Sequence, residues 1–172
     1  MKPTLAIVGG GASGLCAAVC AGRSGGFDRV LLLERGPRVG KKLLATGNGR
    51  CNLTNRFFSP ENYRCRKGSA PDFVKPAFAA FGLTETLAFF ESLGIVPYEE
   101  DGGKLYPRSL QAAAVLDALR LEAEALGTEI LCDTEVTELR PTAEGFLLLT
   151  ANGRFRANRV LLAAGGPASP KL

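Results

Sequence analysis

Short apolar runs alternate with helix-like and glycine-rich segments along this chain, which predicts an α/β fold. Thr4 to Val8 and Arg29 to Glu34 have the length and aliphatic composition of buried strands. The alanine-rich segment between them, from Ser13 to about Gly22, has the composition of a helix. The last apolar run, Arg159 to Ala163, predicts another buried strand. Strand, helix and strand in this order are typical of a parallel sheet.

The middle of the chain begins with a long aperiodic stretch, Gly36 to Ala70, and continues with two or three helices. A loop of this length in a compact domain is usually functional or disordered. Each of the helical patterns is followed by a glycine that can end it. They are Asp72 to Phe81, Glu85 to Leu93 with Thr84 as the N-cap, and Leu110 to Leu126 with Ser109 as the N-cap. The apolar face of the last helix predicts core residues at Leu116, Leu119, Ala123 and Leu126.

Short strands follow Gly127. Glu129 to Cys132 is one, and the next three predict an antiparallel meander. These three are Glu135 to Arg140, Gly145 to Thr150 and Arg154 to Arg156, with turns at Pro141 to Glu144 and at Asn152-Gly153. Asn-Gly between two apolar runs is a strong hairpin signal.

The first strand leads into a dinucleotide-binding fingerprint, Gly9-x-Gly11-x-x-Gly14, in its expected context between a strand and a helix. Gly9 permits a sharp turn out of the strand. Gly11 has no side chain, so backbone N–H groups can approach a pyrophosphate, and Gly14 lets the helix pack near the strand. The start of the helix adds unpaired N–H groups and partial positive charge, and Ser13 could add a hydroxyl donor.

The second strand ends on Glu34, about 20 residues beyond the last fingerprint glycine. Its carboxylate is expected to accept hydrogen bonds from the adenosine ribose. It should also repel a 2′-phosphate, which disfavours NADP at this site, although the adjacent Arg35 weakens that inference. Two alternatives are a glycine turn that binds nothing, and a signal peptide starting at Lys2, whose apolar run the glycines interrupt.

Composition narrows the classes of function. The chain has 172 residues, is 46% hydrophobic and carries a formal charge of +4, which suits one domain or a large piece of one. Nine basic residues and one acid lie between Arg35 and Lys67, which fits a solvated loop or an anion site equally well. No nucleic-acid motif accompanies them, so we expect no nucleic-acid partner. No segment is apolar over enough residues to predict a transmembrane helix, so we expect no membrane partner either.

The chain has five cysteines and no histidine. No two cysteines form a Cys-x-x-Cys pair, so neither a structural zinc site nor a Ser-His or Cys-His catalytic pair is expected. An odd number of cysteines without a secretion signal predicts reduced thiols in a cytoplasmic protein.

Three motifs resemble those of one family, the BaiN/RdsA-type NAD(P)/FAD-dependent oxidoreductases, which are two-dinucleotide-binding flavoproteins. The segment from Gly40 to Asn55, GKKLLATGNGRCNLTN, is similar to the family's signature. Gly103 to Ser109, GKLYPRS, resembles a second motif. Ala164-Gly165-Gly166 with Ser169-Pro170 resembles a third, although the family more often has Thr at the position of Ala164. The resemblance spans the chain and implies a Rossmann-like FAD-binding domain, in which a parallel sheet with helices carries a three-stranded antiparallel meander.

The resemblance also implies FAD as the cofactor, NAD(P)H as the electron donor, and a set of cofactor-binding residues. These are Gly9, Gly11, Ala12, Ser13 and Gly14 at the pyrophosphate; Glu34 and Arg35 at the ribose; Lys42, Thr46, Gly47, Asn48, Gly49, Arg50, Cys51 and Asn52 toward the phosphate–flavin end; Val136, through its backbone, at the adenine; and Ala164, Gly165 and Gly166 after the last strand, where the two glycines would bring bare backbone to the cofactor. From composition alone, the segment from Thr46 to Asn52 fits an ordered Asn/Gly turn equally well.

The sequence pattern assigns no catalytic residue. With histidine absent, Tyr106, Lys104 and Cys51 are the candidates for an acid or base. Cys51 has no partner cysteine at a useful spacing, so a packing role is favoured over a redox role.

Members of the family are longer than this chain. We therefore expect residues 1–172 to be the N-terminal part of an FAD-binding domain, without the inserted second domain and the C-terminal return. Such a part is expected to bind FAD weakly or not at all and to expose apolar sheet surface. The full-length protein would pass hydride from NAD(P)H through FAD to a small organic acceptor, for example a conjugated C=C bond. The alternatives are an NAD-binding dehydrogenase domain and a non-catalytic nucleotide-binding chain.

Overall fold

The computed structural model describes residues 2–64 and 70–166, and the chain forms two compact units. The first, here the sheet unit, consists of Met1–Leu44 and Leu119–Leu172. The second, the central unit, is Ala45–Ala118. Each is described by itself.

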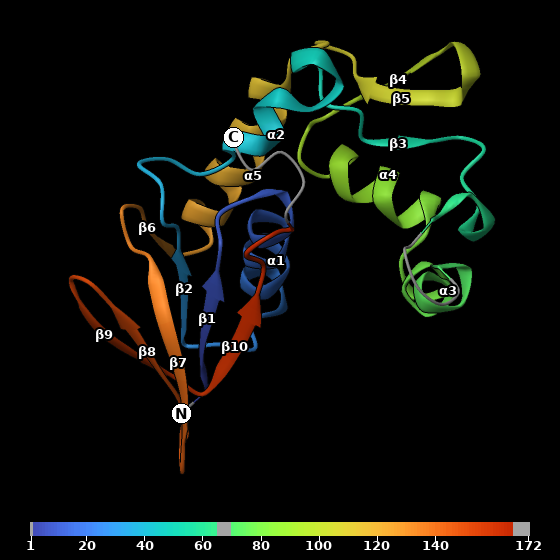
Figure 1. The fold of residues 1–172 in the computed structure, drawn as a ribbon. Helices are drawn as coiled ribbons and strands as arrows, with labels where there is room; N and C mark the ends of the chain where they lie inside the picture. Colours follow the sequence, from blue (N-terminus) through green and yellow to red (C-terminus); the bar gives the residue numbers. More distant parts are fainter. Residues whose placement is uncertain (1, 65–69, 167–172) are drawn as a thin grey trace. The chain divides into compact units, whose positions relative to one another are not determined.

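A parallel four-stranded sheet organises the sheet unit, with the strand order β10-β1-β2-β6 (Figure 1). The strands are β1 (Thr4–Val8), β2 (Arg29–Leu33), β6 (Thr128–Leu131) and β10 (Arg159–Leu162). Val8 is opposite both Leu33 and Leu162, and Leu33 is opposite Leu131. The carboxyl ends of all four strands therefore meet at one edge, as the sequence pattern predicts.

Alternate residues of the strands supply the two faces of the sheet. Helix α1 (Ala12–Ser24) contacts β1 and β2 on one face and buries Leu15, Ala18 and Val19. A three-stranded antiparallel meander covers the other face, which Figure 1 shows on the side opposite α1. The core between meander and sheet consists of Ala6, Leu31, Leu33, Leu148 and Ala157.

The meander confirms the prediction within one or two residues at each end. Its strands are β7 (Val136–Thr142), β8 (Gly145–Thr150) and β9 (Gly153–Ala157). Strand β7 is longer than expected because Pro141 and Thr142 still pair with β8. The first turn is therefore shorter than predicted and lies at Ala143-Glu144, whereas the second has the predicted length and lies one residue earlier, at Ala151-Asn152.

Helix α5 (Ala112–Ala125) begins two residues later than its sequence suggests. Leu110 has a left-handed backbone, with φ of 53°, so it cannot be the first helical residue behind a Ser109 cap. Leu116, Leu119 and Ala123 are buried as predicted, whereas Leu126 is 37% exposed and lies beyond the end of the helix.

Strand β10 is not the buried strand that its apolar run predicts. Within the described part of the chain its only sheet neighbour is β1, and Leu161 and Leu162 are 37% and 69% exposed. An apolar run predicts a strand, but whether its side chains are buried depends on which elements pack beside it.

The central unit holds a small antiparallel sheet, β3-β5-β4, together with helices α3 (Ala70–Ala80) and α4 (Leu83–Glu91). Its strands, β3 (Thr54–Asn55), β4 (Pro97–Glu100) and β5 (Lys104–Pro107), are absent from the sequence prediction. The stretch from Gly36 to Ala70 is also more ordered than predicted, because it contains α2 (Lys41–Ala45), two 3₁₀ turns, η1 (Thr46–Gly49) and η2 (Pro60–Asn62), and β3. A third 3₁₀ turn, η3 (Asp101–Gly103), joins β4 to β5.

Helix α4 shows why its predicted cap is wrong. Gly82 is the N-cap, and its N–H donates to the Glu85 carboxylate at 2.8 Å. Because the Glu85 side chain reaches back to this N–H, the helix begins at Leu83, and Thr84 lies inside the first turn.

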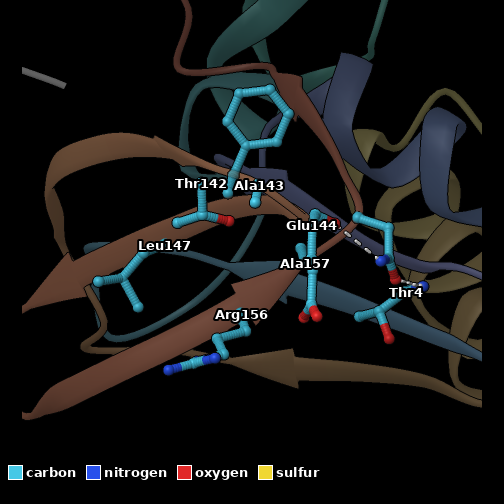
Figure 2. Close-up of a pocket in the computed structure, with 9 residues that line it drawn as sticks. Thr4, Thr142, Ala143, Glu144, Leu147, Arg156 and Ala157 are labelled. Carbon is cyan, nitrogen blue, oxygen red and sulfur yellow. Dashed lines mark hydrogen bonds between the residues drawn. The ribbon is translucent and has the colours of Figure 1, made fainter.

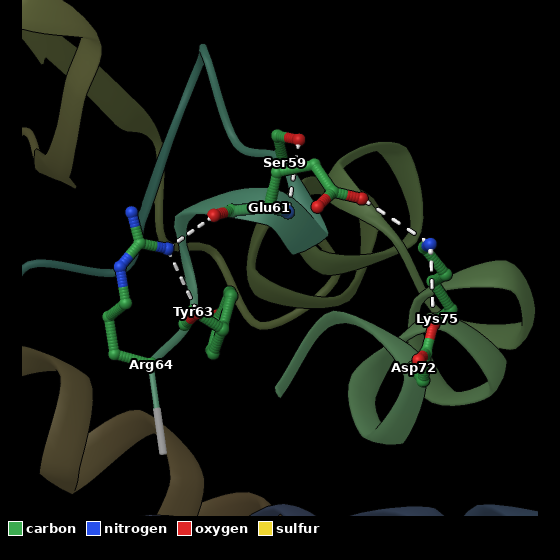
Figure 3. Close-up of polar contacts among 6 residues, drawn as sticks. All are labelled: Ser59, Glu61, Tyr63, Arg64, Asp72 and Lys75. Carbon is green, nitrogen blue, oxygen red and sulfur yellow. Dashed lines mark hydrogen bonds and ion pairs between the residues drawn. The ribbon is translucent and has the colours of Figure 1, made fainter. Parts of the chain in front are cut away.

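Aromatic rings and exposed charges connect η2 with α3. The Phe58 and Phe78 rings lie 4.3 Å apart, and Tyr63 lies 5.1 Å from Phe78. Figure 3 shows Lys75 between Glu61 and Asp72, at 3.4 and 3.6 Å. The side chains of these ion pairs are more than half exposed, so the pairs contribute little and the rings provide most of the stabilisation of this contact.

No single helix among the described residues is long and apolar enough to cross a membrane. One pair of consecutive helical segments, Pro71–Ala80 and Leu83–Glu91, together has the length and apolar composition of such a helix, but the pair is bent by 49°.

A side-chain amide connects the meander to the first strand. Asn158 accepts a hydrogen bond from Thr4 N at 2.8 Å and donates to the Glu144 carbonyl at 3.1 Å. Its own backbone N–H donates to Thr4 O. A hollow of about 460 Å³ lies beside these groups at the amino end of β1, next to Arg156 (Figure 2).

Asn158→Ala removes both side-chain hydrogen bonds and leaves Thr4 N without its acceptor. We expect it to lower the free energy of unfolding by about 1–3 kcal/mol. Urea denaturation measures this, with Asn152→Ala as the control, because the exposed Asn152 makes a single 3.4 Å bond to Asp133 O. Equal losses in the two variants would contradict the role given to Asn158.

Candidate functional site

The three fingerprint glycines differ in what surrounds them. Gly9 has φ of 107°, and a Cβ at this position would overlap the Ala163 carbonyl. A Cβ on Gly14 would overlap the Gly9 carbonyl. Gly11 has no atom within 4 Å of the position its Cβ would take. Gly9 and Gly14 are therefore required by packing, whereas Gly11 leaves open space above the backbone.

Gly10 is a further required glycine that the sequence analysis missed. A Cβ there would lie 2.5 Å from Val39 Cγ1 and 3.1 Å from Glu34 Cβ. Its carbonyl accepts from Gly40 N at 2.8 Å, which brings the start of α2 to the fingerprint loop. The run of three glycines, Gly9 to Gly11, was the signal that could have found it.

The start of α1 is exposed at the surface of the sheet unit. Gly11 is the N-cap, with φ of −77° and no side-chain cap, and the first turn carries no acidic residue. Ala12 and Ser13 are exposed. The unpaired N–H groups and the positive end of the helix therefore point into the space above Gly11, which is suited to an anion.

Glu34 makes two hydrogen bonds that the sequence does not reveal. One carboxylate oxygen accepts from Gly10 N at 2.7 Å and the other from Gly36 N at 2.8 Å. The side chain thus connects the loops that follow β1 and β2. An ionised carboxylate has about four acceptor sites, so capacity for ribose hydroxyls remains. Arg35 beside it is exposed.

The glycine turn after β10 lies against the fingerprint loop. Ala163 N donates to Val8 O at 2.8 Å, and Gly9 packs on Ala163 and Ala164. Gly165 has φ of 79°, and a Cβ on Gly165 or Gly166 would meet nothing within 4 Å. Ser169 and Pro170 of the same motif lie outside the described residues.

Lys42 of α2 also reaches this edge of the sheet. Its Nζ donates to Gly166 O at 3.2 Å. Val136 lies elsewhere in the sheet unit, as the first residue of β7, where it pairs with Thr150 and packs on the core of the meander. The structure therefore groups Gly9 to Gly14, Glu34, Lys42 and Ala164 to Gly166 at the carboxyl ends of the strands.

The predicted residues from Thr46 to Asn52 form a loop of the central unit. Gly47, Asn48, Gly49 and Cys51 all have positive φ, between 56° and 82°. Thr46, Asn48, Gly49 and Asn52 are exposed, whereas Arg50 is half-buried and Cys51 is buried. The loop thus has an outer side of small polar residues and an inner side formed by Arg50 and Cys51.

Burial raises the pKa of the Cys51 thiol, and a hydrogen bond with Thr46 lowers it by less. A protonated, buried thiol is a poor nucleophile, which supports packing over redox chemistry. Tyr106 is only 4% exposed and Lys104 is exposed. None of the four described cysteines, Cys16, Cys20, Cys51 and Cys132, forms a disulfide.

Two hollows among the described residues are lined by residues other than those of the fingerprint loop. One is the space beside Asn158, and the other, of about 510 Å³, lies in the central unit among Phe58, Tyr63, Phe78 and Phe81. Neither includes a residue of Gly9 to Gly14. The site is therefore recognised by its backbone geometry, since a pyrophosphate on a helix start needs close amides and not a deep cavity. In the part of the chain that the structure describes, no group of three or more Cys, Asp or Glu side chains could hold a metal ion.

Glu34→Gln replaces one carboxylate oxygen with an NH₂ group, so either Gly10 N–H or Gly36 N–H loses its acceptor. We expect the free energy of unfolding to fall by about 1–3 kcal/mol. Chemical denaturation checks this against Glu135→Gln, an exposed glutamate outside the site. If the two variants unfold at the same denaturant concentration, Glu34 does not hold the loops together.

The comparisons with known proteins agree with this geometry. Residues 3–172 match the model of the HI0933-like protein Rossmann domain. The chain is 45% identical over 168 residues to a 3-dehydro-bile acid delta(4,6)-reductase of Clostridium scindens, covering 98% of this chain and 40% of that protein. It is 31% identical over 166 residues to a ribosomal RNA dihydrouridine synthase of Escherichia coli, covering 96% and 40%.

Among solved structures, a 3-ketosteroid-delta4-(5alpha)-dehydrogenase of Rhodococcus jostii superposes with a TM-score of 0.63 at 18% identity, over 96% of this chain and 46% of that one. This likeness concerns the fold alone. The chain spans about 40% of the length of the curated relatives it matches. The predicted Rossmann-like fold of the FAD-binding type and the predicted BaiN/RdsA-type resemblance are confirmed. The chain belongs to the HI0933-like family, whose Rossmann domain it contains.

Proposed function

We propose that this chain is the FAD-binding part of a flavin-dependent oxidoreductase. The observation that carries the proposal is the contrast among the fingerprint glycines. Gly9 and Gly14 are closed by packing, whereas Gly11 opens onto space at the start of α1. A glycine loop that is tightly packed at Gly9 and Gly14 but open at Gly11 fits a diphosphate bound by backbone amides.

The residues at this edge of the sheet fit the two ends of an adenosine diphosphate group. The amides at the start of α1 would hold the pyrophosphate, with Lys42 as a nearby cation. Glu34, fixed by Gly10 and Gly36, would accept from the ribose hydroxyls. The bare backbone of Gly165 and Gly166 would allow the cofactor to lie close to the turn after β10.

Bound FAD supplies the capacity to accept a hydride from one substrate and deliver it to another. The chain's own task is to bind and orient the dinucleotide. No described residue is assigned as an acid or base, because Tyr106 is buried and Cys51 is a buried thiol of raised pKa. The proposal is completed by NAD(P)H as donor and a small organic acceptor.

The name of the Clostridium scindens relative supports a conjugated C=C bond as the group reduced, since a 3-oxo compound with double bonds at positions 4 and 6 is a conjugated system. The relatives named for ribosomal RNA are 31% and 30% identical, against 45% for the bile acid reductase. The higher identity favours a small molecule, and an RNA base is the alternative substrate. An NAD-binding dehydrogenase domain is less favoured because it does not predict the meander.

Gly11→Asp tests the cradle without harming the fold. Aspartate is a favoured N-cap residue, and the space around Gly11 is free, so the melting temperature should not fall. Its carboxylate would occupy the helix amides and repel a diphosphate. We expect the affinity for FAD, measured by titration of flavin fluorescence, to drop at least about tenfold.

Gly11→Asn is the matched control, because it has the same shape and capping ability without the charge, and its loss should be smaller. The wild-type chain should also bind FAD in preference to NAD⁺. FAD affinity that is unchanged in Gly11→Asp, or a wild-type chain that responds to NAD⁺ but not to FAD, would contradict the proposal.

A further inference from the structure

Two of the family-like motifs meet inside the central unit through one side chain. Arg50 belongs to the segment Thr46–Asn52, whereas Tyr106 lies in β5, within the motif Gly103 to Ser109. The Arg50 guanidinium carbon lies 4.3 Å from the centre of the Tyr106 ring. One guanidinium nitrogen also lies 3.4 Å from the Tyr106 hydroxyl.

Arg50 has two further partners. It donates to the Glu100 carboxylate at 2.6 Å and, through Nε, to the Gly47 carbonyl at 3.3 Å. The side chains of Arg50 and Glu100 are only about one third exposed, at 35% and 29%. A charge-assisted bond and a stacked aromatic ring in a partly dry position are worth more than a surface ion pair.

The Arg50 contacts lie against a loop whose backbone conformation is unfavourable by itself. Gly47, Asn48, Gly49 and Cys51 are all left-handed, which is unfavourable for the two residues that are not glycine. The loop also closes tightly on Tyr106, because a Cβ on Gly47 would lie 3.1 Å from the Tyr106 ring and 2.8 Å from Asn52 N. Hydrogen bonds from Cys51 N to Thr46 O and from Leu53 N to Leu105 O hold its two ends.

We propose that Arg50 is a positioning residue whose guanidinium, fixed by Tyr106 and Glu100, locks the Thr46–Asn52 loop in the shape that presents Thr46, Asn48, Gly49 and Asn52 outward. The resemblance had placed Arg50 among the cofactor-binding residues. Its side chain points to the inner side of the loop, where it contacts three partners, and its contact with the cofactor stays a prediction. A contact of these outer residues with FAD is implied by the family resemblance and rests on the proposed function, whereas the lock itself does not.

Lysine cannot replace arginine in this arrangement. A planar guanidinium can stack on a ring while its separate N–H groups reach a carboxylate and a carbonyl, but an ammonium is a compact point charge. The buried Cys51 thiol provides a direct reporter, since it is 7% exposed and lies next to Arg50. If the lock opens, the thiol becomes accessible while the rest of the chain stays folded.

The test measures alkylation of Cys51 by iodoacetamide in the FAD-free chain, followed peptide by peptide with mass spectrometry. In Arg50→Ala we expect Cys51 to react roughly tenfold faster or more than in the wild type, the factor that corresponds to losing one charge-assisted contact. Arg50→Lys should lie between the two, and Tyr106→Phe, which keeps the ring, should stay near the wild type. Cys132, in the sheet unit, should react at an unchanged rate in all variants.

Arg56→Ala is the matched control. Arg56 directly follows β3 and pairs with Glu99 of β4 at 2.9 Å, an ion pair that does not involve the Thr46–Asn52 loop. Cys51 reactivity within about twofold of the wild type in both Arg50 variants would overturn the lock, as would an equal rise in Arg56→Ala. If Arg50→Ala does not fold, Arg50→Lys decides by the same criterion.

FAD affinity is then compared between Arg50→Ala and Arg56→Ala, and a loss confined to Arg50→Ala is expected. A wild-type chain that binds NAD⁺ but not FAD, with Cys51 more reactive in Arg50→Ala, would remove the proposed function and leave the lock intact. If the wild-type chain binds FAD and Cys51 reactivity is unchanged in Arg50→Ala, the lock is overturned and the proposed function is retained.

Discussion

The close approach of three backbone segments at the carboxyl edge of the parallel sheet is the constraint on which the rest of the site depends. The start of α1 reaches β1 only because Gly14 has no side chain to strike the Gly9 carbonyl. The turn after β10 reaches the same place only because Gly9 has none to strike Ala163. Glu34 then fixes the loop after β2 to Gly10. With these contacts made, Gly11 and the amides of the helix start are held at the surface in a fixed position.

This arrangement explains why a site without a deep cavity is suited to a large cofactor. A dinucleotide that lies along the edge of a sheet can be bound by a few preorganised amides and by close approach to bare backbone. The glycines that packing requires hold these amides in place, so less conformational entropy is lost when the dinucleotide binds. The hollows beside Asn158 and among the aromatic rings of the central unit have volumes of about 460 and 510 Å³, but neither contains a fingerprint residue. The hollows and the fingerprint loop therefore lie at different residues of this protein, and the backbone geometry of the loop is the more specific indicator of a dinucleotide site.

The sequence predicts what depends on neighbours along the chain. Strand β1, the first helix and the Gly9-x-Gly11-x-x-Gly14 spacing are local patterns, and so are the meander strands with their turn residues. Features that depend on distant partners were missed. The exposure of β10 follows from its place at an edge, and the strands β4 and β5 are short and mix Glu99 and Glu100 with Leu105 and Tyr106. The bonds of Glu34 to Gly10 and of Arg50 to Tyr106 join residues 24 and 56 positions apart, which no local pattern reports.

The most direct measurement of the central claim is a map of backbone amide shifts in ¹H–¹⁵N spectra of the labelled chain as FAD is added. The account predicts that the largest changes fall on Gly11 to Gly14, Glu34 and Gly165, because these amides lie at the proposed pyrophosphate and ribose positions. Changes centred on residues around Asn158 or on the Phe58–Phe78 cluster, with Gly11 to Gly14 unaffected, would contradict it.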